Sequence, residues 1–394
     1  MDTDGVGTLV PSLRTGFQIV MTEQKLSILH TESSTGWGGQ EIRILTEAAG
    51  MIARGHKVVL VTPPDAQIAP AAIKRGIPTI TLPIGRKNLK GFVAMRQYLK
   101  QHGQGFDVIN THSSTDSWLV AANCATLPGM PPLVRTRHVS TPVNNKASTR
   151  WLYQTATTHM VTTGEALRST LNQVNGIALD RMTSVRTGID LDYYKPLVNG
   201  DKATMRAKLK VANKPTIGIL ATLRDWKGHD DLIDAFASIK DEFPEWQILV
   251  IGDGPRWGDI ERRRNAHGLE DRIIMVGNQD NVPEWLNCLD LFVLPSFGDE
   301  GVPQGLMQAM ACGVPAISTP IGAIGEALQD RQTGLMTPPR NVPKLAENLR
   351  RLMGDDSLRQ QFADASLAYS RNFGIDIMLD RMSKAFRQAI AESK

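Results

Sequence analysis

Short apolar runs rich in β-branched residues recur along the chain, and segments with helical spacing of apolar residues separate them. Each run has the length of a buried strand, so strands and helices are expected to alternate. In the first half the predicted strands are 26–30, 57–62, 79–83, 107–112, 133–138, 159–163 and 183–187. In the second half they are 216–221, 247–252, 272–277, 291–295 and 314–318. Such alternation predicts parallel sheets built from βα units, one sheet in each half.

Two series of strands in a chain of 394 residues predict two doubly wound domains, because one ordinary core rarely grows that large. The linker is expected at 190–204, where a Tyr-Tyr-Lys-Pro segment meets polar residues. Residues 378–390 carry apolar side chains at helical spacing and predict an amphipathic closing helix. The polar, Gly-rich residues 1–20 are expected to be a disordered leader or an over-extended start, with Met21 as the alternative first residue.

Between Glu300 and Glu326 the sequence has no charged side chain, and it holds three prolines and five glycines. These residues break a helix repeatedly and exclude a membrane span. The stretch instead predicts a helix at 304–312, with Pro303 in its first turn, and a buried strand after Gly313. Free N–H groups and the dipole at such a helix start favour an anion such as a diphosphate; the alternative is an ordinary βα turn.

The composition is that of a globular protein, with 41% hydrophobic and 21% charged residues. The widely spaced Cys124, Cys288 and Cys312 form no C-x-x-C pair and indicate reduced thiols in a reducing compartment. The sequence does not show a basic start followed by an apolar core, so a secretory signal is not predicted. The expected location is cytoplasmic.

Positive charge is concentrated in the first half, where 20 Lys and Arg residues up to Lys195 outnumber 13 Asp and Glu residues, against 24 and 27 in the remainder. The excess lies in 74–100. Its basic residues include Arg86, Lys87, Lys90, Arg96 and Lys100. Such a face is either a solvated surface or a contact for anionic lipid head groups or a phosphorylated acceptor. Aromatic residues do not interleave regularly with these charges, so nucleic acid is not an expected partner.

Seven motifs, each weak by itself, occur in an order that resembles the family 4 (GT4) retaining glycosyltransferases of GT-B fold. They are 37–41 (Trp-Gly-Gly-Gln-Glu), 106–112 (Phe-Asp-Val-Ile-Asn-Thr-His), 185–190 (Val-Arg-Thr-Gly-Ile-Asp), 223–229 (Leu-Arg-Asp-Trp-Lys-Gly-His), 251–255 (Ile-Gly-Asp-Gly-Pro), 300–308 and 322–335. The resemblance implies an α/β fold with two Rossmann-like doubly wound domains that face each other across a cleft. It covers about residues 26–386.

The resemblance also implies how the two domains divide the work. Residues 21–195, joined by a C-terminal helix at 375–394, would form the acceptor-side domain, and 196–374 the nucleotide-sugar donor domain. Members of this family use a nucleoside-diphosphate sugar and retain the configuration of the sugar, without a metal or other cofactor. The expected acceptor is lipid-linked or a polysaccharide, in lipopolysaccharide or exopolysaccharide synthesis. That chemistry places the enzyme at the cytoplasmic face of the inner membrane, as a peripheral protein.

The same resemblance assigns catalytic roles to His112, Glu300 and Lys227. Glu300 would hydrogen-bond the transferred sugar, Lys227 would neutralise the diphosphate, and His112 would lie beside the reacting carbon. The remaining expected donor contacts are Gly38, Gly39, Arg224, Gln304, Gly305 and Gln308. Candidates for contacts to the sugar or acceptor, with simple loop hydrogen bonding as the alternative, are Arg135, Arg137 and His138.

Three positions depart from the family pattern: Gln308 replaces a glutamate, Arg224 stands three residues before the lysine instead of five or six, and Pro303 replaces a glycine. These changes bear on the donor contacts more than on the fold. The triplet 190–192 has the D-x-D spacing of a metal site, but it falls in the expected hinge, and no metal site is assigned. Two alternatives stay open: a nucleotide-sugar 2-epimerase, which needs no acceptor, and a binding protein that retains the donor site without catalysis.

Overall fold

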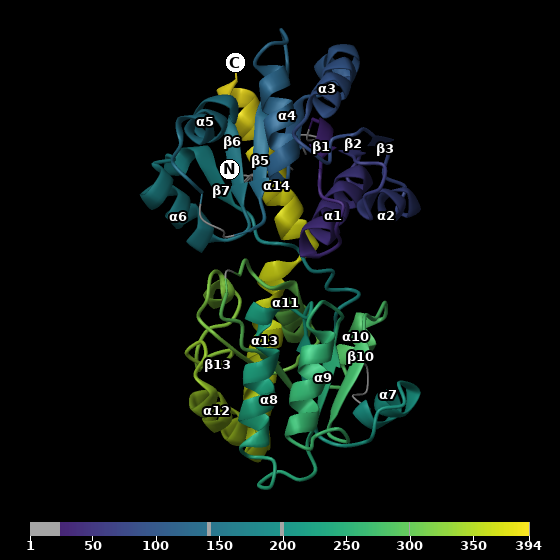
Figure 1. Cartoon of the computed structure of the whole chain (residues 1–394), viewed down its shortest axis with the longest axis vertical. Helices are drawn as coiled ribbons and strands as arrows, with labels where there is room; N and C mark the ends of the chain where they lie inside the picture. Colours follow the sequence, from purple (N-terminus) through teal and green to yellow (C-terminus); the bar gives the residue numbers. More distant parts are fainter. Residues whose placement is uncertain (1–23, 140–142, 198–200, 299, 394) are drawn as a thin grey trace, which may run out of the picture.

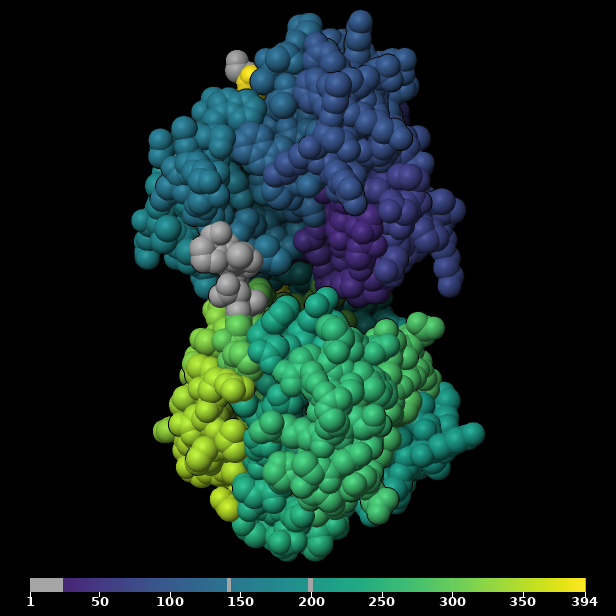
Figure 2. All heavy atoms as spheres, in the orientation of Figure 1, coloured from purple at the N-terminus to yellow at the C-terminus, as the bar shows by residue number. Residues whose placement is uncertain are grey.

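The computed structural model describes residues 24–139, 143–197, 201–298 and 300–393, and the expected leader at 1–20 lies outside them. The chain forms two lobes stacked end to end, each with a parallel sheet and flanking helices (Figure 1). The lobes meet at a narrow waist (Figure 2). The expected α/β architecture of two Rossmann-like domains is confirmed.

The N-terminal domain holds a seven-stranded parallel sheet in the order β3-β2-β1-β4-β5-β6-β7. Its strands are β1 (Ser27–Thr31), β2 (Lys57–Thr62), β3 (Thr79–Thr81), β4 (Val108–Thr111), β5 (Leu133–Arg137), β6 (His159–Thr162) and β7 (Met182–Ser184). Its helices are α1 (Gly39–Ala53), α2 (Ile68–Lys74), α3 (Leu89–His102), α4 (Ser114–Cys124), α5 (Ala147–Arg150) and α6 (Glu165–Asn175). Of the central strands, β4 is wholly buried and β1 is buried apart from its first residue, as expected for a parallel sheet that helices cover on both faces.

The C-terminal domain holds a six-stranded parallel sheet in the order β10-β9-β8-β11-β12-β13. Its strands are β8 (Thr216–Leu220), β9 (Gln247–Ile251), β10 (Ile273–Gly277), β11 (Leu291–Leu294), β12 (Ala316–Ser318) and β13 (Gly334–Met336). The helices after the linker are α7 (Lys202–Lys208), α8 (His229–Ala237), α9 (Trp257–Ala266), α10 (Val282–Leu286), α11 (Gln304–Ala311), α12 (Val342–Gly354), α13 (Asp356–Ser370) and α14 (Ile375–Glu392). One large apolar cluster joins this sheet to its helices.

All twelve predicted strands are present, with ends that differ by three residues or fewer. The sequence did not predict β13, because a three-residue strand carries no readable pattern. The predicted helix at 304–312 is α11, and Gly313 follows it with a φ of 70°, a conformation that favours glycine. Pro303 is not in the first helical turn. It is the N-cap residue, because its ψ of 123° is extended.

The chain crosses between the domains twice, and the two crossings pair with each other. The amide of Ile189 donates to the carbonyl of Phe373 at 2.6 Å, and the amide of Ile375 donates to the carbonyl of Ile189 at 3.1 Å. After the second crossing α14 runs back onto the N-terminal domain (Figure 1). There Leu379 and Phe386 are buried in the same apolar cluster as residues of α1, β1 and β2.

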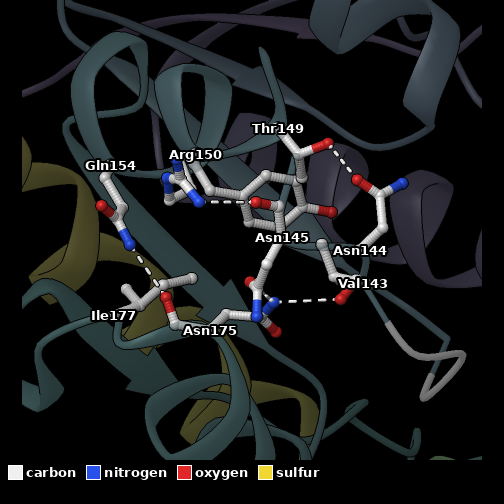
Figure 3. A pocket seen from close by; sticks show the side chains of 9 residues that line it. Val143, Asn144, Asn145, Thr149, Arg150, Gln154, Asn175 and Ile177 are labelled. Atoms are coloured by element: carbon white, nitrogen blue, oxygen red, sulfur yellow. Dashed lines mark hydrogen bonds between the residues drawn. The ribbon is translucent and has the colours of Figure 1, made fainter. Parts of the chain in front are cut away.

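Among the described residues, no helix combines the length and the apolar character that crossing a bilayer requires. A cavity of about 10 Å³ lies beside α5 (Figure 3). The polar groups that line it bond to each other: Arg150 Nη1 donates to the Asn145 carbonyl at 2.6 Å, and Asn175 Nδ2 donates to the Val143 carbonyl at 3.0 Å. A space of this size holds about one water molecule.

Candidate active site

Both sheets reverse their strand order at comparable places, between β1 and β4 in the first domain and between β8 and β11 in the second. In doubly wound folds, ligands bind outside the carboxyl ends of the strands at such a switch point. His112 directly follows β4, while Lys227 and Glu300 lie in the loops after β8 and β11. The predicted catalytic residues therefore occupy both switch points.

A glycine with left-handed backbone fixes the loop after β8 against the loop after β11. Gly228 has a φ of 78°, and a Cβ at this position would lie 2.2 Å from the carbonyl oxygen of Pro295. Only glycine fits such an approach. The amide of Phe297 donates to the carbonyl of Trp226 at 2.8 Å. These contacts hold the turn that carries Lys227 against the segment that leads to Glu300.

Lys227 and Glu300 contact each other directly. The Nζ atom of Lys227 lies 2.5 Å from Oε1 of Glu300, and the two side chains are 18% and 8% exposed. The carbonyl of Glu300 accepts a hydrogen bond from the Ala323 amide at 3.1 Å. A cation and a carboxylate are thus held together in a mostly dry place, which is costly unless each charge is paired.

Two helix N-termini converge on the same region from opposite domains. Gly39 opens α1, Gln304 opens α11, and Gln304 Nε2 donates to the Gly39 carbonyl at 2.7 Å. Gly38 is the N-cap residue of α1. A Cβ on Gly305 would lie 2.6 Å from the last carbonyl of β8, so this glycine lets α11 approach the sheet closely. Gln308 lies one turn after Gln304, on the same face. The first amides of each helix have no partner within their own helix, so they make this place electropositive.

Arg224 is exposed, and its Cζ lies 6.0 Å from the centre of the Trp226 ring. It takes no part in the contact between Lys227 and Glu300. The structure therefore brings Lys227 and Glu300 together but leaves Arg224 exposed and outside their contact.

Sequence reasoning missed Arg256, which directly follows the Gly-Asp-Gly-Pro motif. Its guanidinium contacts Asp225 and, at 2.9 Å, Asp230, and these aspartates flank the turn of Lys227. The Arg256 amide also donates to the Leu223 carbonyl at 3.2 Å. Arg256 therefore stabilises the turn that carries Lys227. The signal that could have indicated it is its place directly after a tight turn at a strand end.

Three histidines form a continuous chain at the carboxyl edge of the N-terminal sheet. His30 Nδ1 lies 2.8 Å from His112 Nε2, and His112 Nδ1 lies 2.9 Å from His138 Nε2. They come from β1 and from the ends of β4 and β5, which are neighbouring strands. Both ring nitrogens of His112 are thereby engaged by other histidines. Sequence reasoning selected His112 and His138 separately and missed His30.

The inner end of this histidine chain faces a buried carboxylate. His30 Nε2 lies 3.9 Å from Glu47 Oε1, and Glu47 Oε2 lies 3.9 Å from Arg43 Nε. Burial raises the pKa of Glu47 to about 7 and lowers the pKa of His30 to about 3. Burial also lowers the pKa values of His112 and His138 well below the ordinary histidine value. The three imidazoles are therefore neutral at pH 7.

The outer end of the histidine chain adjoins the other domain. The carbonyl of His138 accepts from Thr163 Oγ1 at 3.4 Å and lies 3.6 Å from the place of a Cβ on Gly301, the residue after Glu300. His138 is half-buried, whereas His112 is 4% exposed. The outer end of the histidine chain therefore lies beside the segment that carries Glu300.

A second set of cations lies near the carboxyl end of β5 in the N-terminal domain. Arg135 is 4% exposed, and its Cζ lies 4.5 Å from the centre of the Tyr153 ring. Among the described residues, its Nε and Nη1 make no hydrogen bond. Arg137 Nη1 donates to the Tyr153 hydroxyl at 2.9 Å. Lys87 donates to Ser114 Oγ at 3.1 Å, and burial followed by the charge of Arg135 lowers the pKa of Lys87.

Glu326, the carboxylate that ends the uncharged run, joins the two domains. Its Oε1 accepts from the amides of Glu165 at 2.6 Å and Ala166 at 3.1 Å, in the first turn of α6. Its Oε2 lies 3.2 Å from Arg186 Nε. Sequence reasoning gave Glu326 no role, although its isolation at the end of the run was a signal. Asp190 of the D-x-D triplet closes a local turn, because its Oδ1 accepts from the amide of Asp192 at 3.0 Å.

Two family models match the chain, one in each domain. Residues 37–193 match the model described as Glycosyltransferase Family 4, and residues 214–355 match the model described as Glycosyl transferases group 1. The two matched segments contain His112, Lys227 and Glu300.

Curated relatives agree with these models. The lipopolysaccharide core biosynthesis mannosyltransferase LpsB of Rhizobium meliloti is 30% identical over 49% of this chain and 57% of its own length. A D-inositol 3-phosphate glycosyltransferase of Xylanimonas cellulosilytica is 25% identical over 95% of this chain and 97% of its own length. Four of the matched relatives, LpsB among them, align with this chain over only part of their own length. The aligned part spans between 17% and 57% of each of these relatives.

Solved structures show the same fold. HepE from Anabaena, solved in complexes with UDP and with UDP-glucose, superposes with a TM-score of 0.81 in the UDP complex. That match covers 92% of this chain and all of HepE at 20% sequence identity.

Proposed function

We propose that the chain is a family 4 glycosyltransferase that transfers a sugar, with retention, from a nucleoside-diphosphate sugar to a lipid-linked or saccharide acceptor. The observation that carries this proposal is the contact between Lys227 and Glu300 at the switch point of the C-terminal sheet. The UDP and UDP-glucose complexes of HepE support a nucleotide-sugar donor. LpsB supports a role in the synthesis of lipopolysaccharide or a related surface polysaccharide.

Donor binding would exchange partners within the Lys227–Glu300 contact. The diphosphate takes the charge of Lys227 and the amides that open α1 and α11, and Glu300 is then free to accept hydrogen bonds from sugar hydroxyls. Gln308, half-buried on the cleft face of α11, would accept from a ribose hydroxyl without the strength of a charged acceptor. Arg224 would reach the diphosphate after a rotation of its exposed side chain.

The reaction develops negative charge on the leaving diphosphate and positive charge at the anomeric carbon. Lys227 and the two helix N-termini stabilise the first charge, because they are fixed in place before the reaction begins. Closure of the domains excludes water that would otherwise hydrolyse the donor. In the retaining mechanism that we propose, an oxygen of the departing phosphate takes the proton of the acceptor hydroxyl. No side chain is therefore assigned as a general base.

The acceptor would bind on the N-terminal domain, near its basic face. Arg86, Lys87 and Lys90 are exposed beside Leu89, which is 77% exposed at the start of α3. Basic and apolar groups together suit an anionic membrane surface, and Lys87 reaches from this face to the start of α4. The buried donors of Arg135 support an acceptor that carries a phosphate. We accordingly propose a peripheral protein at the cytoplasmic face of the membrane.

A thermal-shift panel of nucleotide sugars tests the donor proposal, because a ligand that binds only the folded protein raises the unfolding temperature. We expect one nucleoside diphosphate and its sugar conjugate to stabilise the protein, and Lys227→Ala to abolish the shift. No shift with any member of the panel would contradict the proposal.

Turnover assays complete the test of the reaction. We propose that the reaction needs no metal, since Lys227 and the helix amides supply the positive charge, so turnover should survive EDTA. NMR of a donor-only incubation distinguishes transfer from 2-epimerisation, which would change the donor sugar without an acceptor. Donor binding without turnover on any acceptor would favour a binding protein instead.

A further inference from the structure

The histidine chain of His30, His112 and His138 allows only two arrangements of its protons. A neutral imidazole has one N–H group, so His112 can donate in one direction and must accept from the other. Both hydrogen bonds therefore run in the same sense. Either all three rings carry the proton on Nε2 and donate toward Glu47, or all three carry it on Nδ1 and donate away from Glu47.

Glu47 decides between these arrangements. It is fully buried, and the guanidinium of Arg43 lies 3.9 Å away and favours its charged form. Asn110 Nδ2 donates to Glu47 Oε1 at 3.4 Å. A carboxylate only accepts hydrogen bonds, so a charged Glu47 attracts the N–H of His30 and repels its lone pair. The chain is then polarised so that each ring donates inward.

The consequence appears at His138, whose backbone carbonyl lies 3.6 Å from the place of a Cβ on Gly301 of the opposite domain. When His138 donates inward through Nε2, its Nδ1 carries a lone pair. Among the described residues, Nδ1 of His138 makes no hydrogen bond. It is the ring nitrogen at the outer end of the histidine chain, in the residue that directly follows β5.

We propose that His138 presents the Nδ1 lone pair to a sugar hydroxyl in the cleft, and that Glu47 fixes this polarity through His30 and His112. The proposal rests on the glycosyltransferase function proposed above and adds a residue of the N-terminal domain that contacts the substrate. His138 is the residue that touches substrate, while His112, His30 and Glu47 are positioning residues. The roles differ from the simple expectation for His112, because both of its ring nitrogens are already engaged.

Measuring the tautomers of the three histidines tests the polarity of the histidine chain directly and needs no substrate. Two-bond ¹H–¹⁵N spectra of the full-length protein at pH 8.5, above the pKa of about 7 that burial gives Glu47, report which ring nitrogen carries each proton. We expect Nε2–H on His30, His112 and His138. Nδ1–H on any of them, or a charged ring, would overturn the proposal.

Two variants separate the role of Glu47 from general damage. Glu47→Gln keeps the size of the side chain but removes its charge, so Nδ1–H forms should become populated in the chain. Glu41→Gln removes another buried carboxylate from the same helix and should leave the tautomers unchanged. His159 is a buried histidine that is not part of the histidine chain, and its signal reports in every sample whether the domain is folded. Unchanged tautomers in folded Glu47→Gln would refute the control by Glu47.

Ligand titrations identify the hydroxyl and keep this proposal distinct from the proposed function. The probes are UDP, UDP-glucose, and UDP with methyl α-glucopyranoside, or the equivalent set for another base selected by the thermal-shift panel. A shift of His138 Nδ1 with UDP-glucose but not UDP assigns the donor sugar, and a shift with the added glucoside assigns the acceptor. Binding of these probes without any shift at His138 would overturn the contact. Failure of every nucleotide sugar to bind would instead contradict the proposed function. The tautomer spectra need no ligand, so they would still test the polarity of the histidine chain.

Discussion

Lys227 and Glu300 stand 73 residues apart in the sequence, yet Nζ of the lysine lies 2.5 Å from Oε1 of the glutamate. The contact depends on two loops that follow adjacent strands, β8 and β11, and on the close approach of Gly228 to Pro295. The pairing satisfies both charges, and in the proposed function a donor diphosphate would take the place of Glu300 as the partner of Lys227.

Replacing Lys227 with alanine should lower kcat by about 10²-fold or more, because the leaving diphosphate loses a fixed positive charge. The measurement is turnover with the donor selected by the thermal-shift panel, together with circular dichroism. Lys214→Ala, which removes an exposed lysine from the same domain, is the matched control and should keep full turnover. Full turnover in folded Lys227→Ala would remove the lysine from the mechanism.

Gly228→Ala should destabilise the protein by roughly 2 kcal/mol or more, because its Cβ would meet the Pro295 carbonyl at 2.2 Å and its φ is 78°. Donor binding should fail too, since the lysine turn must move. Urea unfolding and the thermal shift measure the two effects. Gly258→Ala in α9 is the control: its Cβ would meet only the end of the Arg262 side chain at 3.4 Å, so stability should stay equal or rise slightly. Similar stability of both variants would contradict the close approach.

Glu326→Ala should loosen the contact between the domains, because it removes the acceptor for two α6 amides and the partner of Arg186. The expected loss is about 1–3 kcal/mol in the free energy of unfolding, with a larger radius of gyration in small-angle X-ray scattering. Glu347→Ala removes an exposed carboxylate within α12 and should change neither quantity. An unchanged radius and stability in Glu326→Ala would show that this contact does not hold the domains together.

Acid should destabilise the protein through buried neutral histidines such as His229. Burial, aided by the charges of Lys227 and Arg256, lowers the pKa of His229 from 6.5 to about 3. The unfolded state therefore binds a proton below pH 6.5 while the folded state does not, so stability falls as the pH drops from 6.5 toward 3. At pH 5 this histidine accounts for about 2 kcal/mol of lost stability.

His229→Gln isolates that contribution, because glutamine is polar but does not titrate. Between pH 7.5 and pH 5, urea unfolding should show a smaller loss of stability in His229→Gln than in the wild type. His102→Gln, at an exposed position, should follow the wild type. Parallel curves for the wild type and His229→Gln would contradict the burial of a neutral imidazole.

The apolar runs were sufficient to predict twelve strands, because each run fills a buried position in a parallel sheet. The same pattern could not predict β13, where three residues give no period. The position of α11 followed from Gly313 and the prolines near it, but the placement of Pro303 outside the first turn depends on its ψ, which the sequence does not reveal.

The site was only partly readable for a different reason. Its motifs predicted Lys227 and Glu300 as separate members of one site, but their contact could be inferred only from the order of strands in the sheet. His30, His112 and His138 each stand at or near the end of a predicted strand, but a single sequence does not say which strands are neighbours. Arg256 was missed because its partners lie on another element.

The paired crossings at Ile189 and Phe373 limit how the molecule can open. A single strand of chain between two bodies would let them swivel freely. Two hydrogen-bonded segments should instead restrict the motion to bending about a single hinge axis and should resist twisting. Opening should therefore separate the edges that carry the histidines and the lysine turn without sliding one past the other, so each closure returns the same atoms to the same neighbours.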